Sequence, residues 1–299
     1  MGKAFESSLS VKTGDHQGYT IYFEQSFEHF AEILEKDCKI SGRKVCIVSD
    51  SNVFPLYGSQ ITAALDSHCI VLSQFVFPAG EQNKTLDTVR NLYEHLILNH
   101  FERRDLIIAL GGGVVGDLAG YAAATYLRGI DFVQVPTTLL SQVDSSIGGK
   151  TGVDFDSYKN MVGAFHQPSL VYMNLNTLMS LNEQQFACGM GEILKHGLIK
   201  NAAYYEWLIN HMTEINDREL PVLLKMVQES CKIKKDVVEK DPTEKGERAL
   251  LNFGHTIGHS VEKLKDFKGV AILIDLIVCV LLSYALIIFN VNFLYVILL

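Results

Sequence analysis

The sequence predicts an α/β amino-terminal domain with a parallel sheet, followed by an all-α carboxyl-terminal domain. Short runs rich in Val, Ile and Leu alternate with helix-like segments as far as about residue 175, a pattern typical of parallel βαβ units. From there to about residue 265, the apolar residues recur at helical spacing alone. The 299 residues are 48% hydrophobic, which is enough for a sizeable core and about two domains.

The predicted strands are short apolar runs, most of which end at turn-forming residues such as Asp, Pro or Gly. They are 44–49, 69–77, 106–110 and 131–135. The intervening segments have helical spacing or are rich in small residues, and they predict helices at 85–99 and 114–127.

The second half predicts helices at 183–200, 202–213, 218–239 and 246–265. Asp241-Pro242 separates the last two, because the residue before a proline disfavours the helical conformation. We therefore expect an α/β domain at 1–175, a helical domain at 176–265 and an apolar tail at 266–299.

The charge and cysteine content limit the function classes. A net charge of −8 argues against a nucleic-acid-binding protein, although a few clustered Lys and Arg residues would still attract a small anion. The six cysteines form no CxxC pair, which favours reduced thiols in a cytoplasmic protein. The polar amino-terminal stretch has no apolar core of a secretory signal.

The segment Gly111–Asp117 reads GGGVVGD and follows a predicted strand into a predicted helix. Glycines in this position let a pyrophosphate approach the backbone and the helix amino terminus, so the segment favours dinucleotide binding. A tight strand–helix turn without a ligand is the alternative. The next strand does not end in the acidic residue expected to bind the ribose, and Asp50 is the candidate for that role.

Two polar segments are candidates for binding an anionic substrate. Residues 144–152 combine an Asp, several glycines and a Lys, with Lys159 and Asn160 close behind, and a solvated loop is the alternative. Glu192 and Lys195 are three residues apart on a predicted helix, where an ordinary surface ion pair is the alternative.

Arg248, Asn252, His255 and His259 follow one another at helical spacing, which would place them along one helix face. Two histidines four residues apart can share a metal ion, or one can bind it while the other transfers a proton. A solvated helix face remains the alternative.

Taken together, these segments resemble the 3-dehydroquinate synthases of the sugar-phosphate cyclase group, from about residue 40 to 263. The resemblance includes GEQNK at 80–84, GGGVVGD at 111–117, DSSIGGKTGVD at 144–154, KNMVGAFHQP at 159–168, GMGEILKHGLI at 189–199 and LNFGHTIGHSVE at 251–262.

This resemblance implies a lyase that uses NAD and one divalent metal, usually zinc, with cobalt possible. Such an enzyme converts the seven-carbon keto-acid sugar phosphate DAHP into 3-dehydroquinate and phosphate in the shikimate pathway of aromatic amino acid biosynthesis. It also implies a homodimer, and an α/β domain that binds NAD.

The resemblance assigns roles to residues of this chain. The implied metal ligands are Glu192 and His255, and the implied catalytic residues are Asp144, Lys150, Lys195 and His259. The implied substrate-binding residues are Arg128, Asn160, Lys234, Arg248 and Asn252, with Arg128 reaching into the neighbouring subunit's site. The implied NAD-binding residues are Asp50, Asn52, Glu81, Lys84, Gly112, Gly113, Asp117, Thr137, Thr138 and Lys159.

The chain departs from the family pattern at the third metal ligand. The family has a His there, but this position falls near Ala271, and His259 is the last histidine of the chain. Two protein ligands would bind zinc weakly, so we expect little or no activity unless a residue such as Asp275 or His196 replaces the third ligand. Two other functions therefore stay open, which are a metal-dependent polyol dehydrogenase and a non-catalytic NAD-binding remnant.

The tail 276–299 contains no charged residue. It is long enough to span a bilayer, so a membrane anchor is one interpretation. A buried helix that replaces lost packing and an end unrelated to the family are the other two. A membrane partner is expected only in the first case.

Overall fold

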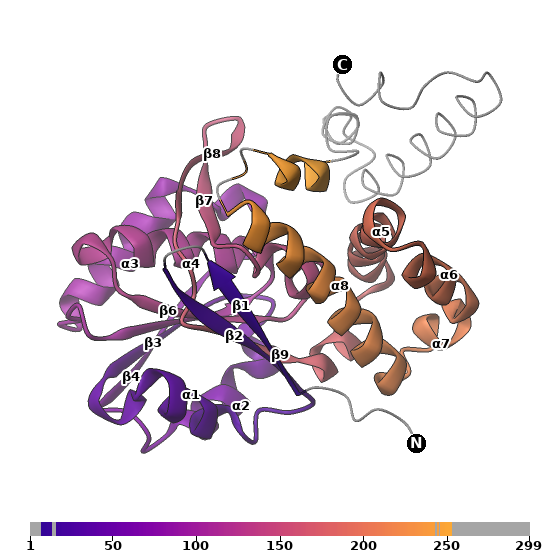
Figure 1. The fold of residues 1–299 in the computed structure, drawn as a ribbon. Helices are drawn as coiled ribbons and strands as arrows, with labels where there is room; N and C mark the ends of the chain where they lie inside the picture. Colours follow the sequence, from indigo (N-terminus) through magenta and orange to yellow (C-terminus); the bar gives the residue numbers. More distant parts are fainter. Residues whose placement is uncertain (1–6, 14–15, 243, 245, 253–299) are drawn as a thin grey trace.

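The computed structural model describes residues 7–13, 16–242, 244 and 246–252 (Figure 1). Its main element is a seven-stranded sheet in the order β1-β2-β9-β6-β5-β3-β4. All neighbouring pairs in it are parallel except β1 and β2, which pair antiparallel at one edge. The strands are β1 (Ser8–Thr13), β2 (His16–Glu24), β3 (Lys44–Asp50), β4 (Val71–Phe77), β5 (Leu106–Gly111), β6 (Asp131–Pro136) and β9 (Leu170–Asn174).

Helices cover both faces of this sheet, which explains why its central strands are apolar throughout. Val45 and Ile47 of β3 pack toward α1 (Phe30–Cys38) and α2 (Phe54–Leu65). The alternate residues Cys46 and Val48 pack toward α3 (Leu86–Leu98) and α4 (Gly113–Thr125). The four strands and two helices predicted in this region are therefore confirmed, with ends that differ by one or two residues.

A two-stranded antiparallel sheet lies against α4 and is formed by β7 (Lys150–Phe155) and β8 (Tyr158–Phe165). Gly152 and Gly163 face each other across the two strands, and a Cβ on Gly152 would lie 2.8 Å from the carbonyl oxygen of Val162. A solvated loop over residues 144–152 is thus wrong, because residues 146–149 are buried and the segment leads directly into β7.

The helical part follows β9 and packs against the β1-β2-β9 side of the sheet. It consists of α5 (Glu183–Lys200), α6 (Ala202–Asn210), α7 (Met212–Asn216) and α8 (Leu220–Lys240). The single helix expected at 202–213 is divided, because His211 has φ −117° and ψ 19° and ends α6.

The prediction of an α-helix from residue 246 is wrong over Glu247–Asn252, which form a 3₁₀-helix. The Asp241 carboxylate accepts hydrogen bonds from the backbone N–H groups of Gly246 (2.7 Å) and Arg248 (3.1 Å), and so holds the chain in a tighter turn. With about three residues per turn, positions four apart no longer share one face. The remainder of the predicted helix, with His255 and His259, lies outside the described residues.

Within the described ranges, no helix has both the length and the apolar character needed to cross a membrane. The tail 276–299 lies outside those ranges.

Candidate active site

The strand order places a topological switch point between β3 and β5. From β3 the chain continues to β4 on one side, whereas from β5 it continues to β6 on the other side. Ligands of α/β proteins bind outside the carboxyl ends of the strands at such a point. Asp50 ends β3 and Gly111 ends β5, so the residues expected to bind NAD gather at this edge.

The glycine-rich turn after β5 fits a phosphate group. No side chain caps the start of α4 at Gly112, and the buried hydroxyl of Thr137, directly after β6, has no hydrogen-bond partner. A Cβ on Gly112 would lie 3.1 Å from Thr138, and a Cβ on Gly113 would lie 3.2 Å from the Ser145 hydroxyl. Backbone N–H groups at a helix start and an unpartnered hydroxyl are suitable partners for a dinucleotide phosphate.

Asp50 is buried, and its carboxylate organises the turn that follows β3. Its Oδ1 atom accepts hydrogen bonds from the backbone N–H groups of Asn52 (2.8 Å) and Val53 (2.9 Å). This Asx-type turn brings Asn52 to the same edge of the sheet, as an NAD-binding role requires.

Lys84 links the dinucleotide turn to the β7–β8 hairpin. Its side-chain nitrogen donates to Asp117 Oδ2 on α4 and to Asn160 Oδ1 on β8, both at 2.6 Å, and lies 4.0 Å from Glu81 Oε1. Burial lowers the pKa of Lys84, but the carboxylate of Asp117 more than compensates, and the pKa lies above its usual value. Asn160, expected to bind substrate, is thus held in the same network as the residues expected to bind NAD. Lys159, its neighbour on β8, is exposed.

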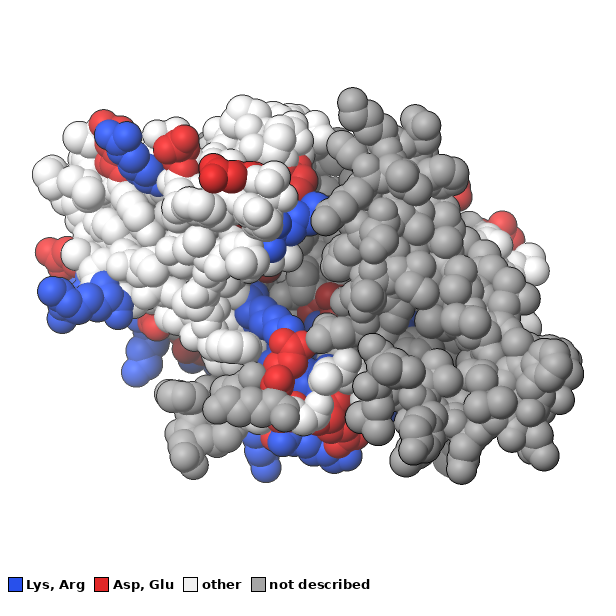
Figure 2. Space-filling view, turned by 90° about the horizontal axis from the view of Figure 1, so that it is seen from above, with Lys and Arg blue, Asp and Glu red and all other residues white. Residues whose placement is uncertain are grey.

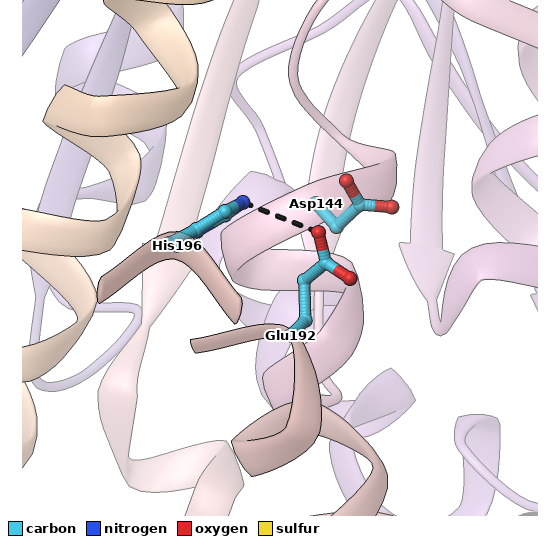
Figure 3. A group of neighbouring side chains, drawn as sticks. All are labelled: Asp144, Glu192 and His196. Carbon is cyan, nitrogen blue, oxygen red and sulfur yellow. Dashed lines mark ion pairs between the residues drawn. The ribbon is translucent and has the colours of Figure 1, made fainter. Parts of the chain in front are cut away.

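Three potential metal ligands, Asp144, Glu192 and His196, lie close together in the structure (Figure 3). Asp144 belongs to a π-helix over Ser141–Ser145, and Glu192 and His196 occupy consecutive turns of α5. One ligand atom from each lies within 4.8 Å of the others. His196 Nε2 is 3.2 Å from Glu192 Oε1, and both atoms are buried without a hydrogen-bond partner. A divalent cation suits such a group of carboxylate and imidazole atoms.

Two lysines hold the carboxylates of this group in place. Lys195 donates to Glu192 Oε2 at 2.7 Å and to the carbonyl oxygen of Leu251 at 2.6 Å. Lys234 pairs with Asp144 Oδ1 and donates to the backbone carbonyl of Asp144 at 2.7 Å. Glu192 and Lys195 are 1% and 3% exposed, so the alternative of a surface ion pair is wrong.

The pKa values of both carboxyl groups are lower than usual. Burial raises the pKa of Asp144, but Lys234 and then Lys195 outweigh it, and the pKa lies well below its ordinary range. Burial and Asp144 both raise the pKa of Glu192, yet the neighbouring His196 and Lys195 side chains lower it overall. Both side chains are therefore ionised at neutral pH, as metal ligands must be.

The remaining basic residues expected at the site lie nearby in the fold. Arg248 is 2% exposed and donates to the carbonyl oxygens of Pro242 (2.8 Å) and Gly148 (3.2 Å). Lys150, at the start of β7, pairs with Glu244 and remains half exposed. Figure 2 shows basic and acidic side chains gathered along the middle of the face seen from above.

Arg128 is not brought to this site. Leu127, Arg128 and Gly129 all have positive φ values, of 51°, 69° and 118°, and form the turn between α4 and β6. Since α4 begins at the carboxyl edge of the sheet, its end and Arg128 lie at the opposite edge. The side chain is exposed, and its role in a neighbouring subunit stays a prediction.

Two residues of the site were not found in the sequence. The Ser230 hydroxyl lies 2.6 Å from His196 Nδ1, and the Gln142 amide donates to the carbonyl oxygens of Pro136 (3.3 Å) and Asn174 (3.4 Å). Ser230 precedes Lys234 by four residues on α8, so the shared helix face is a signal that could have indicated it. The side chains of Asn252, His255 and His259 lie outside the described residues.

Two family models cover most of this chain. One described as 3-dehydroquinate synthase N-terminal matches residues 74–188, and one described as 3-dehydroquinate synthase C-terminal matches residues 189–294. The second match extends into the tail that begins at 266.

Curated relatives agree with these matches. The chain is 44% identical over 260 residues to the 3-dehydroquinate synthase of Acetivibrio thermocellus, with 87% of this chain and 71% of the relative covered. It is 50% identical over 226 residues to that of Symbiobacterium thermophilum, with 76% and 63% covered. The chain thus spans between about six and seven tenths of these relatives' length.

Two solved structures have a similar fold. A 2-deoxy-scyllo-inosose synthase complexed with carbaglucose-6-phosphate, NAD⁺ and Co²⁺ is 28% identical, with a TM-score of 0.78 over 90% of this chain and 73% of that chain. The 2-epi-5-epi-valiolone synthase ValA of Streptomyces hygroscopicus subsp. jinggangensis, with NAD⁺ and Zn²⁺ bound, is 29% identical, with a TM-score of 0.78 over 89% and 74%.

Proposed function

The chain belongs to the 3-dehydroquinate synthase family, and from this premise we propose that it converts DAHP into 3-dehydroquinate and inorganic phosphate with NAD and one divalent metal. This is the reaction of a carbon–oxygen lyase in the shikimate pathway. NAD accepts a hydride from a ring hydroxyl and later returns it, so the reaction has no net oxidation. The relatives at 44% and 50% identity carry this name, whereas the cyclases with other products are less similar.

One observation carries the proposal, namely that two adjacent residues of the π-helix lie at the dinucleotide turn and at the metal-ligand group. Ser145 packs on Gly113 in the dinucleotide turn, and Asp144 belongs to the metal-ligand group with Glu192 and His196. A hydroxyl held at the metal would therefore lie beside the cofactor that oxidises it. Such positioning of two reactants is a large part of the catalysis of a hydride transfer.

The metal, when bound, supplies a Lewis acid that makes the hydroxyl easier to oxidise. Among the described residues, Glu192 with Asp144 and His196 would hold it, and the unpartnered atoms of Glu192 and His196 support this assignment. The resemblance adds His255, which lies outside the described part of the chain.

The basic residues suit the two anionic groups of the substrate. Lys195 and Lys234 keep the carboxylates of Glu192 and Asp144 oriented, because each donates a short hydrogen bond to one of them. Lys150 and Arg248 are assigned to the phosphate and carboxylate of the substrate, since both lie next to the buried segment that follows the π-helix. Their fixed positions orient the ring hydroxyl toward the cofactor.

The test is phosphate release from DAHP by the purified chain, with NAD and Zn²⁺ or Co²⁺ in excess. We expect release that depends on NAD and on the metal, and that is lost in Glu192→Gln, which keeps the shape of the side chain but not its charge. NADH accumulation with glycerol and without phosphate release would indicate a polyol dehydrogenase. NAD binding with neither product would indicate a non-catalytic remnant.

Several finer points belong to the same proposal. Zinc as the metal is supported by the Zn²⁺ named with one structural relative, although Co²⁺ is named with another. A homodimer, a cytoplasmic location and the domain limits 1–175 and 176–265 follow from the family resemblance and the sequence pattern. Metal analysis of the purified chain tests the identity of the metal, and light scattering tests the homodimer.

A further inference from the structure

We propose that Asp154 is a positioning residue of the substrate site, which holds Asn160 so that its amide N–H groups face an oxygen of the anionic substrate. The inference rests on the proposed function, because it concerns the site assigned to DAHP there. Neither the sequence pattern nor the family resemblance gives Asp154 a role. Asp154 is half-buried near the end of β7, and Asn160 lies on β8 of the same hairpin.

A closed ring of three hydrogen bonds joins Lys84, Asp154 and Asn160. The carbonyl oxygen of Lys84 accepts from the backbone N–H of Asp154 at 2.8 Å. Asp154 Oδ1 accepts from the backbone N–H of Asn160, also at 2.8 Å. Asn160 Oδ1 accepts from the side-chain nitrogen of Lys84 at 2.6 Å. Because the ring is closed, none of the three residues can move away from the other two without breaking one of these hydrogen bonds.

The hairpin depends on the Asp154 carboxylate at this point. The register of β7 and β8 shifts between Val153 and Phe155, so Asp154 alone lies opposite residues 159–161 of β8. Asn160 has a φ of +56°, in the left-handed region that Asn adopts more readily than most residues. The carboxylate of Asp154 binds the backbone N–H of Asn160 in this irregular stretch. Irregularities of this kind re-aim side chains next to active sites.

The ring also fixes which end of the Asn160 amide faces Lys84. An ammonium group can only donate, so the atom at 2.6 Å from Lys84 Nζ must be the amide oxygen. The amide nitrogen is thus directed away from Lys84, and Asn160 is exposed. Its two N–H groups suit an acceptor, such as an oxygen of a carboxylate, a phosphate or a carbonyl group.

Lys84 connects this ring to the dinucleotide turn. It is 3% exposed, and it also donates to Asp117 Oδ2 on α4 at 2.6 Å. Loss of the Asp154 carboxylate leaves that hydrogen bond in place, together with the backbone hydrogen bond between Asp154 and Lys84. Substitution of Asp154 should therefore weaken substrate binding through Asn160 and change NAD binding little.

The experiment is a calorimetric titration of the full-length chain with DAHP in the presence of NADH and Zn²⁺. NADH cannot accept a hydride, so the substrate binds without being oxidised. Asp154→Ala and Asn160→Ala should each weaken DAHP binding by about 10- to 100-fold, as expected for a lost hydrogen bond to a charged group. Asp154→Asn should restore the affinity, because its amide oxygen can accept the same hydrogen bond. Asp156→Asn is the matched control, because it removes a carboxylate from the exposed turn of the same hairpin, and it should bind DAHP like the unmodified chain.

Two further variants show whether Asp154 acts through Asn160. The double variant Asp154→Ala with Asn160→Ala should bind DAHP within about twofold of Asn160→Ala alone, because residues that act as a unit are not additive. Asn160→Asp keeps an oxygen for Lys84 but removes the N–H donors, and it should weaken DAHP binding by about 10-fold or more. Since Asn160 is exposed, this last variant tests the inference even if Asp154→Ala does not fold.

The inference is overturned if the losses of the two alanine variants multiply, if Asp154→Asn binds as weakly as Asp154→Ala, or if Asn160→Asp has unchanged affinity. Equal weakening of NAD binding in Asp154→Ala would also overturn it, because this would indicate a general disturbance of the site. So would failure of the unmodified chain to bind DAHP. Phosphate release with NAD is measured separately, so a chain that binds DAHP as expected but releases no phosphate contradicts only the proposed function.

Discussion

Gly148 occupies a position where any side chain would disturb the buried Arg248. Its φ is +99°, in the region that L-residues rarely adopt. A Cβ there would overlap Arg248 Nη2 and lie 3.1 Å from Arg248 Cζ and 3.0 Å from Val238 Cγ2. Arg248 is 2% exposed, and its guanidinium donates to the carbonyl oxygens of Pro242 and Gly148, so a shift of the side chain would break these hydrogen bonds.

Gly148→Ala should therefore lower the free energy of unfolding through two costs. The positive φ costs about 1–2 kcal/mol. Disruption of the hydrogen bond between the Arg248 guanidinium and the Gly148 carbonyl costs about 1.5–3 kcal/mol. The expected total of about 2.5–5 kcal/mol is measured by urea unfolding.

Gly129→Ala separates the two costs. Gly129 has a similar φ of +118°, but the nearest atom to a Cβ there is Ala124 O at 3.9 Å. It should lose only the backbone term of about 1–2 kcal/mol. Equal losses in the two variants would refute the reasoning, because the contact with Arg248 would then cost nothing.

Three further predictions concern other parts of the site and the core. Lys84→Met leaves the Asp117 carboxylate without its partner at 2.6 Å, and should lower the free energy of unfolding by about 3–5 kcal/mol. It should also weaken NAD binding, measured by fluorescence titration. Unchanged NAD affinity would contradict the assigned role. Asn182→Ala removes the side chain that accepts from Gln185 N at the start of α5, and should cost about 1 kcal/mol in urea unfolding, with a larger loss arguing for a further contact. Burial raises the pKa of the Cys38 and Cys46 thiols to about 12. Iodoacetamide at pH 8 should therefore leave both thiols unmodified in the folded chain and label them after unfolding, as measured by mass spectrometry. Rapid labelling of Cys46 in the native protein would be inconsistent with this packing.

The central strands were predictable because they are buried on both faces. Lys44–Asp50 and Leu106–Gly111 form apolar runs too short for helices, and each ends at a residue of the candidate NAD site. β9 was not predicted, although Leu170–Asn174 is fully buried, since five residues give little periodicity. The β7–β8 hairpin was not found either, because its glycines and lysines resemble a loop.

The site was predictable in its components more than in its arrangement. The resemblance assigned Asp144, Glu192, Lys195 and Lys234, and the structure brings these four together. The pairing of His196 with Ser230 depends on how α5 packs against α8, which no local pattern in the sequence reports. The 3₁₀-helix at Glu247–Asn252 likewise depends on the tertiary contacts of Asp241 and Arg248.

The π-helix at Ser141–Ser145 makes the length of this segment critical. A π-turn contains one residue more than the α-helical turn it replaces. Deleting a residue here would convert this wide turn into an α-turn, so the side chains inside the turn could not all keep their present directions. Asp144 would then leave the ligand group at the same moment as Ser145 left Gly113. Homologous chains can therefore vary in side chains across this stretch far more readily than they can gain or lose a residue.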